Sequence, residues 1–143
     1  MCQRGEENVF DIEKDPYNCV RRMVFCRWKP FIIQAMAKDG VINFARFTKQ
    51  LPITEKVLAQ NLKALEADGL VSRTVIPDMP PRTEYQLTPR GKSLVPLLNG
   101  FYDWGWKAMK EEHMSVDLSG EIWHGYREKG ETSMEDIYNN RNE

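Results

Sequence analysis

The sequence predicts a mainly α-helical fold with a small β-hairpin: a winged helix-turn-helix with flanking dimerisation helices. Two observations predict it. Residues 65–94 contain the end of a helix, two short strands joined by a loop with proline and arginine, and a newly capped helix. Just upstream, residues 54–68 form an amphipathic helix whose exposed face carries Lys56, Gln60 and Lys63. A helix suited to the major groove beside a basic loop indicates DNA binding.

Charge is unevenly distributed along the 143 residues. The formal net charge is −1, yet residues 19–110 contain 15 Lys and Arg against 7 Asp and Glu, a net of +8. The two ends together contain 5 basic and 14 acidic residues, a net of −9. The basic part coincides with the predicted winged helix, so its surface should attract phosphates and its binding should weaken steeply with salt. The alternative is that these charges only form a solvated face.

Length and composition predict one domain with extensions, because 41% apolar residues suffice for a core. We expect an acidic N-terminal arm over residues 1–14, a winged helix-turn-helix domain over 15–110 and an acidic C-terminal extension over 111–143, with short helices. No apolar run approaches the roughly 20 residues that cross a bilayer, and the N-terminus lacks the regions of a signal peptide. A cytoplasmic protein without membrane contact is expected.

Residues that could catalyse a reaction or bind a metal are few. The three cysteines, Cys2, Cys19 and Cys26, contain no C-x-x-C pair, and His113 and His124 lie far along the chain. This pattern argues against a structural zinc site. Because no catalytic grouping and no glycine-rich phosphate loop is present, we expect neither an enzyme nor a bound cofactor.

Two helices are predicted before the helix-turn-helix. The first covers residues 17–25, with Val20 and Met23 on its apolar side. The second begins near Trp28 and stops at Gly40. The aromatic and aliphatic residues of the second helix recur at helical spacing, which favours core packing over a ligand site.

A compact helix-turn-helix unit follows. Asn43 is placed to cap a short helix, Pro52 and Ile53 to form the turn, and Thr54 to cap the next helix. In that next helix, three leucines at i, i+4 and i+7 leave the opposite face to polar residues. An ordinary amphipathic surface helix would look similar, but the wing that follows disfavours this alternative. The candidate DNA-contacting residues here are Thr54, Glu55, Lys56, Gln60 and Lys63.

The wing is predicted from two segments rich in β-branched and aromatic residues. Residues 71–76 and 83–87 flank the turn sequence PDMPP, which indicates a hairpin. Arg73 in the first strand and Arg82 at the start of the second are candidates for phosphate or minor-groove contacts. Of these two arginines, Arg82 is the stronger candidate for a DNA contact. We give equal weight to the alternative that Arg82 is only solvated or paired with Glu84.

A long helix is predicted from Thr88, the cap, through about Lys110. Its apolar stripe exceeds what a small wing can cover, so we expect a homodimer through this helix and the first one. The alternative is that the stripe belongs to an intramolecular core. The candidate dimerisation residues are Val20, Met23, Leu94, Leu97, Leu98, Phe101 and Trp104.

The sequence resembles the HxlR family of winged helix-turn-helix transcriptional regulators in three segments: RWKPFII, FARFTKQLPITEKVLAQNLKALEADGLVSRTVIPDMPPRTEYQLTPRGKSLVPLL and YDWGW. The resemblance spans residues 15–106, and its most specific parts are LEADGLVSR, PPRTEYQLT and GKSLVPLL in this order. It implies a dimeric, cytoplasmic, bacterial-type repressor or activator that dimerises through its terminal helices.

Three features depart from the family pattern. The resemblance implies a sensor cysteine before a proline at the start of the first helix, where this chain has Asp15 and Pro16. Cys19 and Cys26 remain as candidate sensors, although a cysteine on a helix is more often a small buried apolar residue. The turn reads LPIT without the family's usual glycine, and the tail beyond Lys110 has no counterpart.

These observations predict a sequence-specific DNA-binding regulator that acts as a homodimer on a palindromic operator, as a repressor. The expected partners are double-stranded DNA, a second copy of the chain and an unidentified small-molecule effector. The alternative is a winged-helix protein-interaction module without specific DNA binding, which the basic central part disfavours. One aromatic cluster either forms dimer core, which we favour, or lines an effector pocket: Trp28, Phe101, Tyr102, Trp104 and Trp106.

Overall fold

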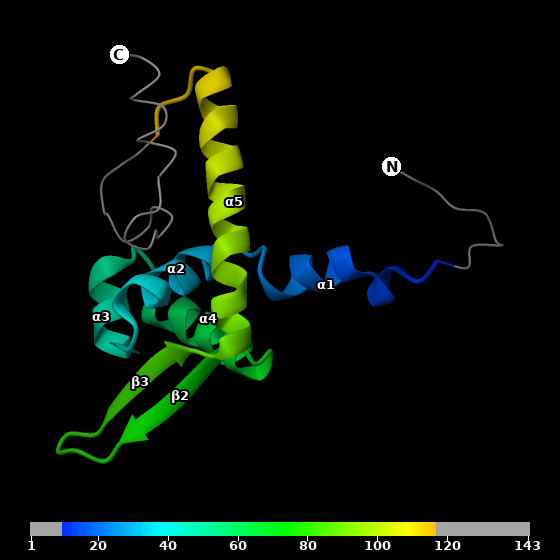
Figure 1. The fold of residues 1–143 in the computed structure, drawn as a ribbon. Coiled ribbons are helices and arrows are strands. Elements are labelled where there is room, and N and C mark those ends of the chain that lie inside the picture. The colour runs from blue at the N-terminus through cyan, green and yellow to red at the C-terminus, as the bar shows by residue number, and fades with distance from the viewer. Residues whose placement is uncertain (1–9, 117–143) are drawn as a thin grey trace.

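The computed structural model describes residues 10–116 as a helical body with a small sheet below it (Figure 1). The long helix α5 rises above the body, and α1 extends from it to one side (Figure 1). The predicted C-terminal helices, Cys2, His124 and most of the predicted acidic arms lie outside the described residues. The elements are η1 (Ile12–Lys14), α1 (Pro16–Met23), α2 (Lys29–Asp39), β1 (Ile42–Asn43), α3 (Phe44–Gln50), α4 (Glu55–Ala67), β2 (Val71–Ile76), β3 (Arg82–Leu87) and α5 (Pro89–Glu111).

This order of elements confirms the predicted mainly α fold with its wing. The sequence prediction missed one strand, β1, in which Ile42 pairs with Tyr85 and Asn43 with Glu84. The sheet therefore has three antiparallel strands in the order β1-β3-β2 rather than two. A strand of two residues is too short to show the alternation of apolar and polar residues by which strands are recognised in a sequence.

Side-chain caps begin the helices at the predicted residues. Each cap oxygen accepts a hydrogen bond from one of the N–H groups that have no partner in the first turn of a helix. The start of each of α3, α4 and α5 is thus set by a local hydrogen bond. For α3, Asn43 accepts from the Arg46 N–H at 2.9 Å. For α4, Thr54 accepts from the Val57 N–H at 3.3 Å, and for α5, Thr88 accepts from the Gly91 N–H at 3.1 Å.

The core lies between α2, α3, α4 and the sheet. The α4 leucines that the sequence placed on one face are all buried, and the face of α2 that carries its aliphatic residues is buried with them. Each such side chain stabilises the fold by about 1.5–3 kcal/mol relative to an exposed one. The largest fully buried side chains are Phe47, Ile32, Ile33, Met36, Ile42, Leu58, Leu62, Leu65, Leu70 and Val71.

Helix α5 packs against α2 through a buried amide pair and through Leu98. The Gln34 side chain donates from Nε2 to Asn99 Oδ1 at 2.8 Å. Leu98, one of the predicted dimerisation residues, is only 6% exposed and belongs to the core of the single chain. Leu94 and Met23, also predicted to form the dimer, are partly buried against the same core.

The first turn of α5 is packed directly on the junction between α4 and β2. The Thr88 hydroxyl donates to the Gly69 carbonyl at 2.6 Å, and Arg90 Nη1 donates to the Asp68 carbonyl at 3.1 Å. Gly91 is buried at this point, where a Cβ would overlap the Leu70 carbonyl oxygen. The junction therefore fixes how α4 leads into the wing.

We predict that Gly91→Ala lowers the free energy of unfolding by about 2 kcal/mol, because the added methyl group must displace backbone atoms. Gly100→Ala, in the same helix, is the matched control. No heavy atom lies within 4 Å of a Cβ built on Gly100, so this change should stabilise the helix by about 0.5–1 kcal/mol. Urea denaturation of the two variants at equal protein concentration measures both effects, and equal midpoints would contradict the packing described.

Candidate nucleic-acid interface

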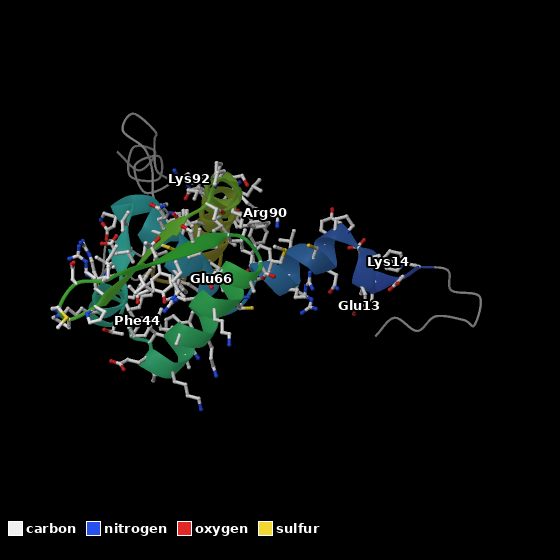
Figure 2. The ribbon with its side chains drawn as sticks, turned by 90° about the horizontal axis from the view of Figure 1, so that it is seen from below. Glu13, Lys14, Phe44, Glu66, Arg90 and Lys92 are labelled. Carbon is white, nitrogen blue, oxygen red and sulfur yellow. The ribbon has the colours of Figure 1, made fainter. Side chains whose placement is uncertain are left out.

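Helix α4 presents its polar side to solvent. Lys56, Gln60 and Lys63 are all exposed, opposite the buried leucines, as the sequence predicted. In the view from below, side chains of α4 project away from the rest of the molecule (Figure 2). Within residues 10–116 neither lysine takes part in a hydrogen bond or an ion pair, so both charges are available to an anionic partner.

The N-terminus of α4 carries the other two candidate contacts. The Thr54 Oγ1 accepts from the Val57 N–H and caps the helix, while its own O–H remains able to donate. Glu55 is exposed in the first turn. The end of the helix that normally enters the major groove therefore bears a hydroxyl donor and a carboxylate acceptor.

The turn between α3 and α4 does not require the glycine that the family usually has. Leu51 is buried and Ile53 packs partly against the core, so apolar contacts anchor the turn. None of residues 51–54 has a positive φ. The turn LPIT is therefore formed without a backbone conformation that requires glycine.

Helix α3 contributes no unpaired arginine to this surface. Arg46 Nη2 lies 3.1 Å from Asp39 Oδ2 at the end of α2, and this ion pair joins the two helices. Among the described residues, Arg46 is thus held within the fold, whereas Lys56 and Lys63 of α4 and Arg73 of the wing have no acidic partner.

The wing is a regular hairpin of six facing residue pairs, from Val71 opposite Leu87 to Ile76 opposite Arg82. Arg73 is exposed and, among the residues described, has no acidic partner. Arg82, the stronger candidate in the sequence, lies 3.5 Å from carboxylate oxygens of both Asp78 and Glu84. The structure therefore makes Arg73 the wing arginine that is free for a phosphate.

Asp78 is the residue that the sequence prediction missed here. Its spacing of four residues from Arg82 indicates an ion pair across the loop, because the two ends of a tight hairpin loop lie close together. The sequence prediction did not include this ion pair because it interpreted the loop only as a turn.

The start of α1 is capped by Asp15, at the position where the sequence resemblance implies a sensor cysteine. Its carboxylate accepts from the N–H groups of Tyr17 at 2.8 Å and Asn18 at 3.3 Å. Of the two candidate sensor thiols, Cys19 is half-buried with its Sγ 3.4 Å from Met23 Sδ, whereas Cys26 is exposed. Both are free thiols.

Within residues 10–116, no three His, Cys, Asp or Glu side chains are grouped so that they could hold a metal ion. None of the helices in that range is both long and apolar enough to span a bilayer.

The sequence profile of the HxlR-like helix-turn-helix family matches residues 23–113, which include α4 and the whole wing. The chain belongs to the HxlR-like helix-turn-helix family. It is therefore a transcriptional regulator with a DNA-binding helix-turn-helix fold, as the sequence resemblance implied.

Individual proteins agree with this family assignment. An HTH-type transcriptional regulator of Methanothermobacter thermautotrophicus is 40% identical over 80 residues, covering 55% of this HxlR-like chain and 60% of the relative. The regulator BH0655 of Halalkalibacterium halodurans is 39% identical over 100 residues, covering 69% and 88%. The solved structure of the redox regulator HypR in its reduced form superposes with a TM-score of 0.63 at 32% identity, covering 69% of this chain and 97% of HypR.

For this HxlR-like regulator, we predict opposite outcomes at the two wing arginines. Arg73→Ala should reduce the slope of log Kobs against log salt by about 1, because one phosphate contact is lost. Arg82→Ala should leave that slope unchanged, because its charge is already compensated by Asp78 and Glu84. Fluorescence anisotropy on a bound duplex measures the slope of each variant. The salt concentration is varied from roughly 50 to 200 mM, over which such slopes are resolved. A reduced slope for Arg82→Ala would instead show that Arg82 contacts a phosphate, as the sequence predicted.

Proposed function

We propose that the regulator binds a palindromic operator as a homodimer and represses transcription. The observation that carries the proposal is the exposed face of α4 beside the projecting wing, where two lysines and a glutamine have no partner among residues 10–116. Such a face is complementary to the major groove, in which phosphates flank a row of hydrogen-bonding base edges.

Each residue on this face has a chemical role that fits DNA. Gln60 is able to bond an adenine through its amide, and Lys56 and Lys63 are able to donate to guanine or to phosphate oxygens. Glu55, at the N-terminus of α4, is able to accept from the amino group of cytosine. Thr54 would donate its hydroxyl to a backbone phosphate, and Arg73 would add a phosphate contact from the wing.

The proposed dimer uses the outward face of α5. Leu97, Phe101 and Trp104 are 61%, 57% and 72% exposed, on the side opposite the buried Asn99. Phe25, which follows α1, packs edge to face on Phe101 with ring centroids 5.0 Å apart and extends the apolar surface. Val20 on α1 is exposed as well. Apolar side chains gathered in this way indicate an interface, because a monomer gains nothing by exposing them to water.

A two-fold dimer would account for both a palindromic operator and repression. Two copies of α4 would enter major grooves about one helical turn, roughly 34 Å, apart. A protein that occupies this length of a promoter would exclude other proteins from it.

We predict that changing Lys56, Gln60 and Lys63 together to alanine abolishes binding to a palindromic operator and leaves the dimer intact, because none of the three is buried. The matched control removes two other lysines of α5, Lys92 and Lys107. Lys92 lies on the side of the molecule away from α4 (Figure 2). Electrophoretic mobility shift and sedimentation of each variant measure the two properties. Unchanged operator affinity of the α4 variant would refute the DNA-reading role of this helix.

We predict that Trp104→Asp converts the protein to a monomer and weakens operator binding at least tenfold, the equivalent of about 1.4 kcal/mol, because one half-site contact is lost. Val41→Asp is the control, since Val41 is also an exposed apolar residue but lies far from α5 in the sequence. Sedimentation equilibrium reports the mass of each variant. A Trp104→Asp protein that remains dimeric would place the interface elsewhere.

A further inference from the structure

Trp106 is buried without belonging to the core. Of the α5 residues after Asn99 it alone is buried, at 5% exposure, although the C-terminal part of α5 rises above the body (Figure 1). Among residues 10–116, it stands apart from the cluster of buried side chains that forms the core. Its indole N–H is also buried and has no acceptor within that range. Because a buried N–H is costly to leave unpaired, whatever covers this ring should supply an acceptor.

The aromatic and cationic groups next to Trp106, among the described residues, lie on its own helix. The ring centroids of Tyr102 and Trp106 are 6.4 Å apart, and Lys110 Nζ lies 5.5 Å from the Trp106 centroid. These residues precede and follow Trp106 by four positions, so they flank it along the helix. Side chains one turn away on the same helix cannot by themselves enclose the outer face of an indole.

The side of α5 that carries Trp106 is not the proposed dimer face. At about 100° per residue, Trp106 lies roughly 20° from Asn99 and roughly 180° from Leu97 around the helix. Leu97 belongs to the exposed apolar face that we assign to the second copy, together with Phe101 and Trp104. A second copy bound there would leave the Trp106 side of α5 uncovered.

The chain turns back where α5 ends. His113 has a positive φ of 58°. Its N–H donates to the Lys110 carbonyl at 3.1 Å, and the Met114 N–H donates to the Met109 carbonyl at 2.8 Å. The two bonds and the left-handed residue form a Schellman motif, which ends a helix and redirects the chain. Figure 1 shows the last described residues leaving the top of α5 and heading back toward the body.

The residues that follow are able to reach Trp106 and to cover it. Glu111, the last residue of α5, lies five residues beyond Trp106, which is about 7.5 Å along the helix axis. An extended chain advances about 3.3 Å per residue, so the chain after the turn draws level with Trp106 close to Val116. Residues 117–126 read DLSGEIWHGY and contain these large apolar residues: Leu118, Ile122, Trp123 and Tyr126.

The C-terminal half of α5 needs packing to persist as a helix. Pro96 lies inside α5, and Gly100 and Gly105 are poor helix formers with open space where a Cβ would lie. A helix of fewer than about 12–15 residues is marginal without tertiary contacts. Cover on the Trp106 side would therefore stabilise the part of α5 that extends beyond the body.

We propose that residues 117–126 pack on the Trp106 side of α5 and that a backbone carbonyl of this segment accepts the Trp106 indole N–H. This segment then completes α5 on the side opposite the second copy and stabilises the helix through which the dimer is proposed to form. The HxlR-like profile ends at residue 113, so the contact belongs to a part of the chain beyond the family match. Packing of this segment requires neither an operator nor a dimer, and so goes beyond the proposed function.

The test follows the Trp106 indole N–H by NMR in the full-length chain, with isotope-labelled tryptophan. The Trp106→Phe variant identifies its resonance among those of the four tryptophans. Ile122→Asp, which places a charge in the apolar segment, should speed exchange of this N–H with solvent by about tenfold or more, because the covering contact opens. Ile137→Asp, the same change later in the sequence, is the matched control and should leave the exchange unchanged.

Hydrogen–deuterium exchange of the backbone gives the reciprocal measurement. Trp106→Ala should raise the exchange of residues 117–126 by about tenfold, and Ile122→Asp should raise that of residues 102–111 by a similar factor. Because Trp106 lies outside the core, Trp106→Ala should keep the fold, which circular dichroism checks.

Three outcomes would overturn the inference. If Ile122→Asp leaves both the indole N–H and residues 102–111 protected, residues 117–126 do not cover Trp106. If Trp104→Asp, the variant expected to be monomeric, exposes the indole while Ile122→Asp does not, a second copy covers it instead. If the indole N–H of the unmodified chain already exchanges freely, nothing covers the ring. DNA binding enters none of these measurements, so failure of the proposed function would leave them decisive.

Discussion

The packing of the first turn of α5 on the Leu70 carbonyl is the contact on which the rest of the structure depends. It brings together the end of α4, the start of β2 and the base of β3 at one residue without a side chain, Gly91. Gly69, with its positive φ of 74°, ends α4 at the same point. A recognition helix and a wing must approach one duplex together, so their relative position has to be set by backbone contacts rather than by flexible side chains. The helix that is proposed to join two subunits begins at this same point.

Charge pairing distinguishes two groups among the basic residues near the candidate interface. Arg46 and Arg82 are paired with carboxylates and hold elements of the fold in place. Lys56, Lys63 and Arg73 are exposed without such partners among the described residues. Exposed ion pairs contribute little stability, typically about 0–1 kcal/mol. Their larger effect here is to compensate the charges of Arg46 and Arg82, so that Lys56, Lys63 and Arg73 remain the candidates for phosphate contacts on α4 and the wing.

Local signals in the sequence predicted the helices, the caps and the two wing strands because each of these is set by residues close together in the chain. Asn43, Thr54 and Thr88 are caps for this reason. The strand β1 was missed because its two residues are extended only through pairing with Tyr85 and Glu84, some forty residues later. Likewise Leu98 and Leu97 are equivalent in the sequence as apolar neighbours. Only the position of α2 decides that Leu98 is buried and Leu97 is exposed.

The candidate contacts on α4 could be predicted because helical periodicity fixes which residues oppose a buried stripe. The state of Arg82 could not, since it depends on the distances to two carboxylates across a loop. Trp104 and Trp106 were likewise grouped in one aromatic cluster by the sequence. Only the folded chain shows that Trp106 is buried and Trp104 exposed.

The cap at the start of α1 has a chemical consequence for the regulator. A thiol at this position could be converted by oxidants to a sulfenic acid or a disulfide. The carboxylate of Asp15 cannot follow that course, and it holds the Tyr17 and Asn18 N–H groups by an interaction that oxidants leave unchanged. The cap at the first turn of α1 is thus itself insensitive to oxidants.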